Sequence, residues 1–179
     1  MNPKEKTSSL PNLYLIGFMG TGKSSAGLLT AQKLKLQFID SDEQIENLIG
    51  SSISNIFKIQ GEKKFRELEK KFIQSGHPQS GCVVSCGGGL PIPEGMVEIL
   101  KSKGKVFSLH ASVKTILERT SKNNSRPLLQ SENPMNEIKS LLRKREPRYL
   151  LADQVISTDQ RRTEQVADEI VRHYLNSIS

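Results

Sequence analysis

One stretch near the N-terminus has the residue types and spacing that bind a polyphosphate. Residues 17–24 read Gly-Phe-Met-Gly-Thr-Gly-Lys-Ser and fit the pattern G-x-x-x-x-G-K-[ST]. Backbone N–H groups at a helix N-terminus can donate hydrogen bonds to phosphate oxygens. Lys23 adds a positive charge on a flexible stem, and the hydroxyl of Ser24 is available to Mg²⁺. The stretch predicts a nucleoside triphosphate site; the alternative is a glycine-rich turn that opens an ordinary helix.

Two further short motifs carry groups that could face a second substrate. Asp40 and Asp42 are separated by one residue, so in an extended strand both side chains would point the same way. One carboxylate could support Mg²⁺ through water, and the other could accept a hydroxyl proton from a phosphoryl acceptor. The alternative is a helix N-cap followed by an acid in the first turn. Three glycines at 87–89 suit close approach to a small polar ligand, or a tight turn before Pro91.

Several arginines could bind the anionic groups of such substrates. A guanidinium binds carboxylate or phosphate through two parallel hydrogen bonds. Arg66 lies one helical turn before Glu69, which could orient it. Arg145 precedes Tyr149 by four residues, and Arg126 lies in a polar segment seven residues after Arg119. Each arginine taken singly could equally be a solvated surface residue.

The segments that must position these residues alternate between strand-like and helix-like patterns. We expect the helix after the glycine-rich stretch to be followed by a helical region over 42–76 that is interrupted near Gly50 and Gly61. Residues 121–135 are polar and contain two prolines, which predicts a mobile loop. The expected strands are 13–16, 36–40, 82–86, 106–110 and 154–157, and the later helices are 93–103, 113–122, 136–150 and 164–178.

Alternating strands and helices predict an α/β fold with a five-stranded parallel sheet covered by helices on both faces. Ligands bind such sheets at the carboxyl ends of the strands. Gly17, Asp40 and Gly87 each end or follow a predicted strand. We therefore expect these three positions to meet around one cleft.

Composition favours a single cytoplasmic domain over 1–179. The chain has 35% hydrophobic and 25% charged residues and no apolar run long enough to span a bilayer. Cys82 and Cys86 are expected to be buried free thiols, and no His or Cys cluster predicts a zinc site.

The net charge of +7 suits either nucleic acid or anionic substrates. Because only 5% of residues are aromatic and no long basic run occurs, we favour anionic substrates.

Taken together, the motifs resemble those of the shikimate kinase family, which has the P-loop fold of nucleoside-monophosphate kinases. The resemblance spans nearly the whole chain, and its specificity comes from the joint order and spacing of the motifs rather than from any one of them. They are residues 17–25, the Asp-x-Asp pair at 40–42, Gly61 with Phe65, Arg66 and Glu69, the glycines 87–89, Arg126-Pro127-Leu128-Leu129, and Arg145 to Tyr149.

The resemblance implies a Mg²⁺-dependent kinase that transfers the γ-phosphoryl group of ATP to the 3-hydroxyl of shikimate, in aromatic amino-acid biosynthesis. It implies a substrate-binding segment over about 42–76 and a lid over about 121–135. Lys23, Asp42 and Arg126 would be catalytic, with Asp42 the candidate base. Mg²⁺ would be held by Ser24 and, through water, by Asp40. The implied ATP-binding residues are Gly20, Thr21, Gly22, Lys23, Ser24, Ser25, Arg119 and Arg126; those for shikimate are Asp42, Arg66, Gly88, Gly89 and Arg145.

Two rival functions remain open from the sequence alone. A gluconate kinase would also need groups for a carboxylate and hydroxyls, although Arg66 and the glycines 87–89 favour shikimate. A nucleotide-gated regulatory or nucleic-acid-binding module is the rival outside enzymes. We expect a monomer that binds small molecules and neither nucleic acid nor membranes.

Overall fold

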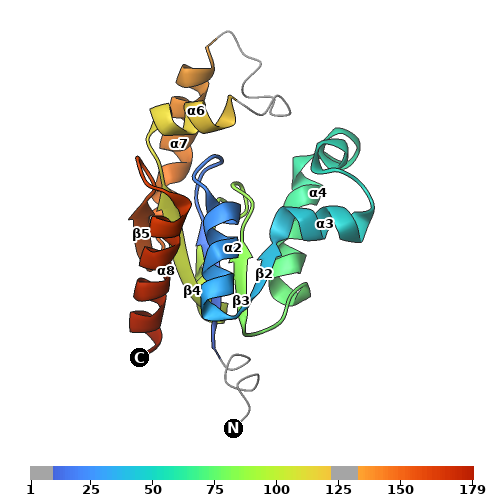
Figure 1. The fold of residues 1–179 in the computed structure, drawn as a ribbon. Helices are drawn as coiled ribbons and strands as arrows, with labels where there is room; N and C mark the ends of the chain where they lie inside the picture. The colour runs from blue at the N-terminus through green and yellow to red at the C-terminus, as the bar shows by residue number, and fades with distance from the viewer. Residues whose placement is uncertain (1–9, 122–132) are drawn as a thin grey trace.

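The computed structural model describes residues 10–121 and 133–179, and its centre is a parallel sheet of five strands (Figure 1). The strand order is β2-β3-β1-β4-β5, and every pairing is parallel. This confirms the predicted fold class. The strands are β1 (Asn12–Ile16), β2 (Gln37–Asp40), β3 (Cys82–Ser85), β4 (Gly104–His110) and β5 (Gln154–Ser157).

Alternating side chains of β1 explain why both faces of the sheet are covered. Leu13 and Leu15 point into one apolar cluster, while Tyr14 and Ile16 belong to the other. The first cluster is completed by α2 (Lys23–Leu34) and α8 (Thr163–Ile178), which lie side by side in front of the sheet in Figure 1. The second is completed by α4 (Ile53–Ser75), α5 (Met96–Lys103), α6 (Val113–Thr120) and α7 (Pro134–Tyr149). The prediction that helices cover both faces of the sheet is therefore confirmed.

The helices that follow β2 form a projection beside the sheet (Figure 1). Asp40 ends β2 and caps α3 (Ser41–Ile49), because its Oδ1 accepts a hydrogen bond from the backbone N–H of Asp42 at 3.1 Å. Asp42 therefore lies in a helical turn, and the extended arrangement of the two acids is wrong. The interruptions near Gly50 and Gly61 are confirmed: α3 ends at Gly50, and Gly61 has φ 78° and ψ 168° inside α4.

Other helix boundaries differ from the sequence-based expectation for local reasons. Helix α5 begins at Met96 rather than at Pro93, because Gly95 has φ 77°, which no right-handed helix accommodates. Helix α7 begins at Pro134, after an Asn133 side chain that caps it. Most of the predicted lid lies outside the described residues. Among the residues that the structure describes, no helix is long and apolar enough to cross a membrane.

Candidate functional site

A cavity of about 930 Å³ opens at the carboxyl ends of the strands. Asp40 and Gly87 line it, as the topology predicts; Gly17 does not line it, although its carbonyl accepts a hydrogen bond from the lining residue Lys23. Every predicted site residue among the described residues also lines this cavity. They are Gly20, Thr21, Gly22, Lys23, Ser24, Ser25, Asp40, Asp42, Arg66, Gly88, Gly89, Arg119 and Arg145. Arg126 lies outside the described residues.

The glycine-rich loop between β1 and α2 is closed on itself and presents a helix N-terminus to the cavity. Gly22 caps α2 in the left-handed conformation, with φ 89° and no side-chain hydrogen bond. The Lys23 ammonium donates to the carbonyl oxygens of Gly17 and Phe18 at 3.0 and 2.9 Å. Thr21 Oγ1 donates to the Phe18 carbonyl at 2.8 Å. The uncapped N–H groups and the lysine charge make this end of the cavity suitable for an anion.

A cluster of oxygen atoms joins the loop to β2 and β3. Ser24 Oγ donates to Asp40 Oδ2 at 2.8 Å and lies 3.2 Å from Ser85 Oγ. Hard oxygen donors of this kind suit Mg²⁺, which is usually bound by one or two protein groups, substrate phosphates and waters. Ser85 is 2% exposed and was not predicted to belong to the site. A hydroxyl at the end of an apolar strand is the sequence feature that could have indicated it.

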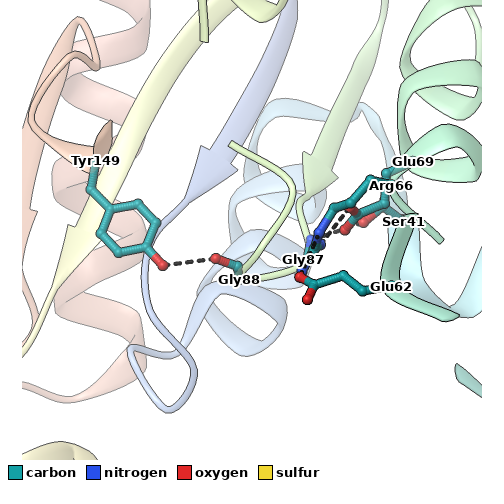
Figure 2. Close-up of polar contacts among 7 residues, drawn as sticks. All are labelled: Ser41, Glu62, Arg66, Glu69, Gly87, Gly88 and Tyr149. Atoms are coloured by element: carbon teal, nitrogen blue, oxygen red, sulfur yellow. Dashed lines mark hydrogen bonds and ion pairs between the residues drawn. The ribbon is translucent and has the colours of Figure 1, made fainter. Parts of the chain in front are cut away.

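Asp42 and the glycine-rich turn after β3 are locked together. The Gly87 N–H donates to Ser41 Oγ at 2.9 Å (Figure 2). Asp42 packs so closely on Gly87 that a Cβ atom there would collide with its carboxylate. Burial, reinforced by the nearby Asp40, raises the pKa of Asp42 to about 6. Among the described residues, Asp42 Oδ1 has no hydrogen-bond partner, so it is available to a ligand hydroxyl.

Arg66 is held on α4 between two acids (Figure 2). Its Nη1 donates to Glu69 Oε2 at 2.6 Å, which confirms the expected support from Glu69. Its Nε and Nη2 donate to Glu62 Oε1 at 3.2 and 2.9 Å, a contact that the sequence reasoning missed. Burial raises the pKa of Glu69 to about 7 in spite of the adjacent guanidinium. The glycine at 89 leaves room for Arg66, because a Cβ atom there would collide with both terminal nitrogens.

Arg145 reaches the same cavity from α7. Its guanidinium carbon lies 5.9 Å from the ring centre of Phe18, a cation–π contact with the loop after β1. One turn further on, the Tyr149 hydroxyl donates to the Gly88 carbonyl at 2.7 Å (Figure 2). This hydrogen bond links the end of α7 to the glycine turn. Arg148, three residues further along α7, does not line the cavity.

Arg119 lies on α6 and lines the cavity beside the glycine-rich loop. Its Nη1 donates to Thr158 Oγ1 at 2.9 Å and to the Gly20 carbonyl at 3.2 Å, and its Nη2 donates to the Thr158 carbonyl at 2.8 Å. Thr158 follows β5 and is 2% exposed. Arg119 and Thr158 are 39 residues apart, so their contact has no local signature in the sequence.

The comparisons with known proteins agree with one another. The family model described as shikimate kinase matches residues 19–175. A shikimate kinase of Thermodesulfovibrio yellowstonii is 44% identical over 92% of this chain and 95% of that protein. A structure of shikimate kinase from Acinetobacter baumannii in complex with shikimate has a TM-score of 0.89 and 36% identity over 98% of both chains.

A gluconokinase structure from Sinorhizobium meliloti shares the fold with a TM-score of 0.65 at 17% identity, over 93% of this chain and 92% of that one.

Proposed function

The chain belongs to the shikimate kinase family, and from this premise we propose that it transfers the γ-phosphoryl group of ATP to the 3-hydroxyl of shikimate. The products would be shikimate 3-phosphate and ADP, in the biosynthesis of aromatic amino acids. One observation carries the proposal: a single cavity joins the glycine-rich loop to a pocket with two arginines and the half-buried Asp42.

The nucleotide would occupy the side formed by the glycine-rich loop, α6 and the segment after β5. The loop N–H groups of Gly20 to Ser25 and the Lys23 charge would hold the phosphates. Arg119, fixed in place by Thr158, would pack against the adenine. When bound, Mg²⁺ would neutralise phosphate charge; Ser24 would be its direct ligand and Asp40 would hold its water shell, a fit that the 2.8 Å Ser24–Asp40 contact supports.

Shikimate would occupy the side formed by α3, α4, α7 and the glycine turn. Arg66 and Arg145 would bind its carboxylate, beside the backbone of Gly88 and Gly89. Asp42 would accept a hydrogen bond from the 3-hydroxyl and take its proton during transfer. A cavity that fixes both substrates lowers the barrier by orientation, while the cationic groups stabilise the transferring charge.

Several parts of the sequence-based prediction stay within this proposal. We propose Arg126 as the lid arginine that contacts the γ-phosphate, within a lid over about 121–135. We also propose that 1–179 is one domain with its substrate-binding segment over about 42–76, and that it acts as a monomer in the cytoplasm. Cys82 and Cys86, which are buried free thiols as expected, suit a reducing compartment.

A direct test measures ADP release with a panel of hydroxy acids that includes shikimate, quinate and gluconate. We expect efficient turnover with shikimate only, and loss of turnover when EDTA removes Mg²⁺. Turnover of gluconate in preference to shikimate would replace the assignment, and turnover of neither acid would refute it.

A further inference from the structure

The guanidinium of Arg66 has five N–H donors, and its contacts account for three of them. Glu62 Oε1 accepts from Nε and from Nη2, at 3.2 and 2.9 Å, and Glu69 Oε2 accepts from Nη1 at 2.6 Å. Among the described residues, one N–H therefore remains on each terminal nitrogen. Two parallel donors are what a bidentate carboxylate requires.

Two aromatic rings and the glycine turn lie next to these two donors. The rings of Phe57 and Phe65 pack on each other with centroids 4.9 Å apart, and these centroids lie 6.0 and 5.6 Å from the central carbon of the guanidinium, on one side of it. The terminal nitrogens point to Gly89, where a Cβ atom would collide with both of them. The two terminal nitrogens of the guanidinium therefore face the backbone of the glycine turn, while its Nε edge is occupied by Glu62.

Glu62 and Glu69 contribute to this arrangement in different ways. The Glu69 side chain is 2% exposed and lines the cavity, whereas that of Glu62 is 64% exposed and lies outside the lining. Glu62 directly follows Gly61, whose φ of 78° interrupts α4. The helix restarts there, which places Glu62 one turn before Arg66 and brings its carboxylate to the Nε edge.

We infer that Glu62 is a positioning residue, which occupies the Nε edge of Arg66 and so makes the substrate carboxylate bind end-on, beside Gly89. The inference rests on the proposed function, because it concerns the shikimate carboxylate. Without Glu62, the Nε edge offers a second pair of donors. A carboxylate bound to that edge would be displaced from Gly89, and the hydroxyl to be phosphorylated would move with it.

The test compares Glu62→Ala and Glu62→Gln with Glu67→Ala. Glu67 lies on the same helix, has a side chain that is 55% exposed, and pairs with Lys64 at 3.4 Å outside the cavity. We expect the KM for shikimate to rise about two- to five-fold in Glu62→Ala, the effect that an exposed ion pair supports. Glu62→Gln keeps one acceptor oxygen and should show a smaller rise. The KM for ATP should stay unchanged in all three variants.

An analogue with a hydroxymethyl group in place of the carboxylate separates positioning from folding. If Glu62 acts through the carboxylate, its replacement will not change the KM for this analogue. An equal rise for both substrates would overturn the inference, as would an unchanged or lower KM for shikimate. Should Glu62→Ala fail to fold, Glu62→Gln decides the question. Wild-type protein that did not phosphorylate shikimate would refute the proposed function instead.

Discussion

Arg145 and Arg148 lie on the same helix, but only Arg145 lines the cavity. Replacing Arg145 by alanine removes a charged donor, and a hydrogen bond to a charged group contributes about 1.5–3 kcal/mol. We therefore expect the KM for shikimate to rise about 10- to 100-fold in Arg145→Ala, with little change in the KM for ATP. Steady-state kinetics against both substrates measures this.

Arg148→Ala is the matched control for that experiment, because it removes the same charge one turn nearer the end of α7. Its shikimate KM should remain within about two-fold of the wild-type value. The reverse pattern, in which Arg148→Ala raises the KM and Arg145→Ala does not, would transfer the carboxylate role to Arg148.

Glu69 is buried, with a side chain that is 2% exposed, and it should make stability depend on pH. Its pKa rises from 4.5 to about 7 on folding. Between these values the folded state binds more protons than the unfolded state, so the free energy of unfolding falls as pH rises. In Glu69→Gln this fall should be smaller between pH 5 and 8, as measured by urea denaturation followed by circular dichroism. A slope equal to that of wild type, or of the exposed control Glu67→Gln, would contradict the raised pKa.

At the residue scale, the sequence identified most of the described polar side chains around the cavity, because their motifs are local, but it missed Ser85 and the lining residues within 158–163. It left open whether Asp42 lies in a strand or in the first turn of a helix. The spacing of Asp40 and Asp42 fits both a strand and a helix N-terminus, and the capping hydrogen bond decides for the helix. Glu62 was overlooked because its pairing with Arg66 depends on the helix restarting after Gly61.

At the scale of elements, the segment between β5 and α8 connects the sheet to the nucleotide side. The Thr158 N–H donates to the His110 carbonyl at 2.8 Å, and its own side-chain and carbonyl oxygens both hold Arg119. Thr158→Val keeps the shape and the carbonyl but removes Oγ1. We expect the KM for ATP to rise about two- to ten-fold and that for shikimate to stay constant, because one hydrogen bond to a charged group is lost.

Thr115→Val provides the control for that variant, since it removes a hydroxyl that contacts Ser112 at 3.0 Å on α6 and does not line the cavity. Equal changes in the KM for ATP in both variants would indicate a general effect on α6. No change in Thr158→Val would mean that Arg119 needs only the carbonyl contacts.

Elements were predicted well where one local pattern determines them. The strands followed from short apolar runs, and the parallel sheet followed from their alternation with helices. Helix starts were harder to predict, as α5 shows, because Pro93 indicates a start while the left-handed Gly95 prevents one until Met96. The contact between Tyr149 and Gly88 joins residues 61 apart, and only the assembled fold could reveal it.

At the scale of the molecule, the cavity combines two groups of elements, and each group contributes its own positively charged side chains. The first turn of α2 and helix α6 supply Lys23 and Arg119, while helices α4 and α7 supply Arg66 and Arg145. Because the proposal places each substrate on a different group of elements, each substrate should stabilise the fold when it is bound alone.

Thermal unfolding can test this independence. A ligand at 100 times its Kd adds about 2.7 kcal/mol, and about 2–4 °C follow from each kcal/mol in a chain of this size. We expect ADP and shikimate each to raise Tm by about 5–10 °C in the wild type. Arg66→Ala should lose the shift with shikimate and keep the shift with ADP, while Lys23→Ala should do the reverse. A variant that lost both shifts together would show that the two sides of the cavity form a single binding unit.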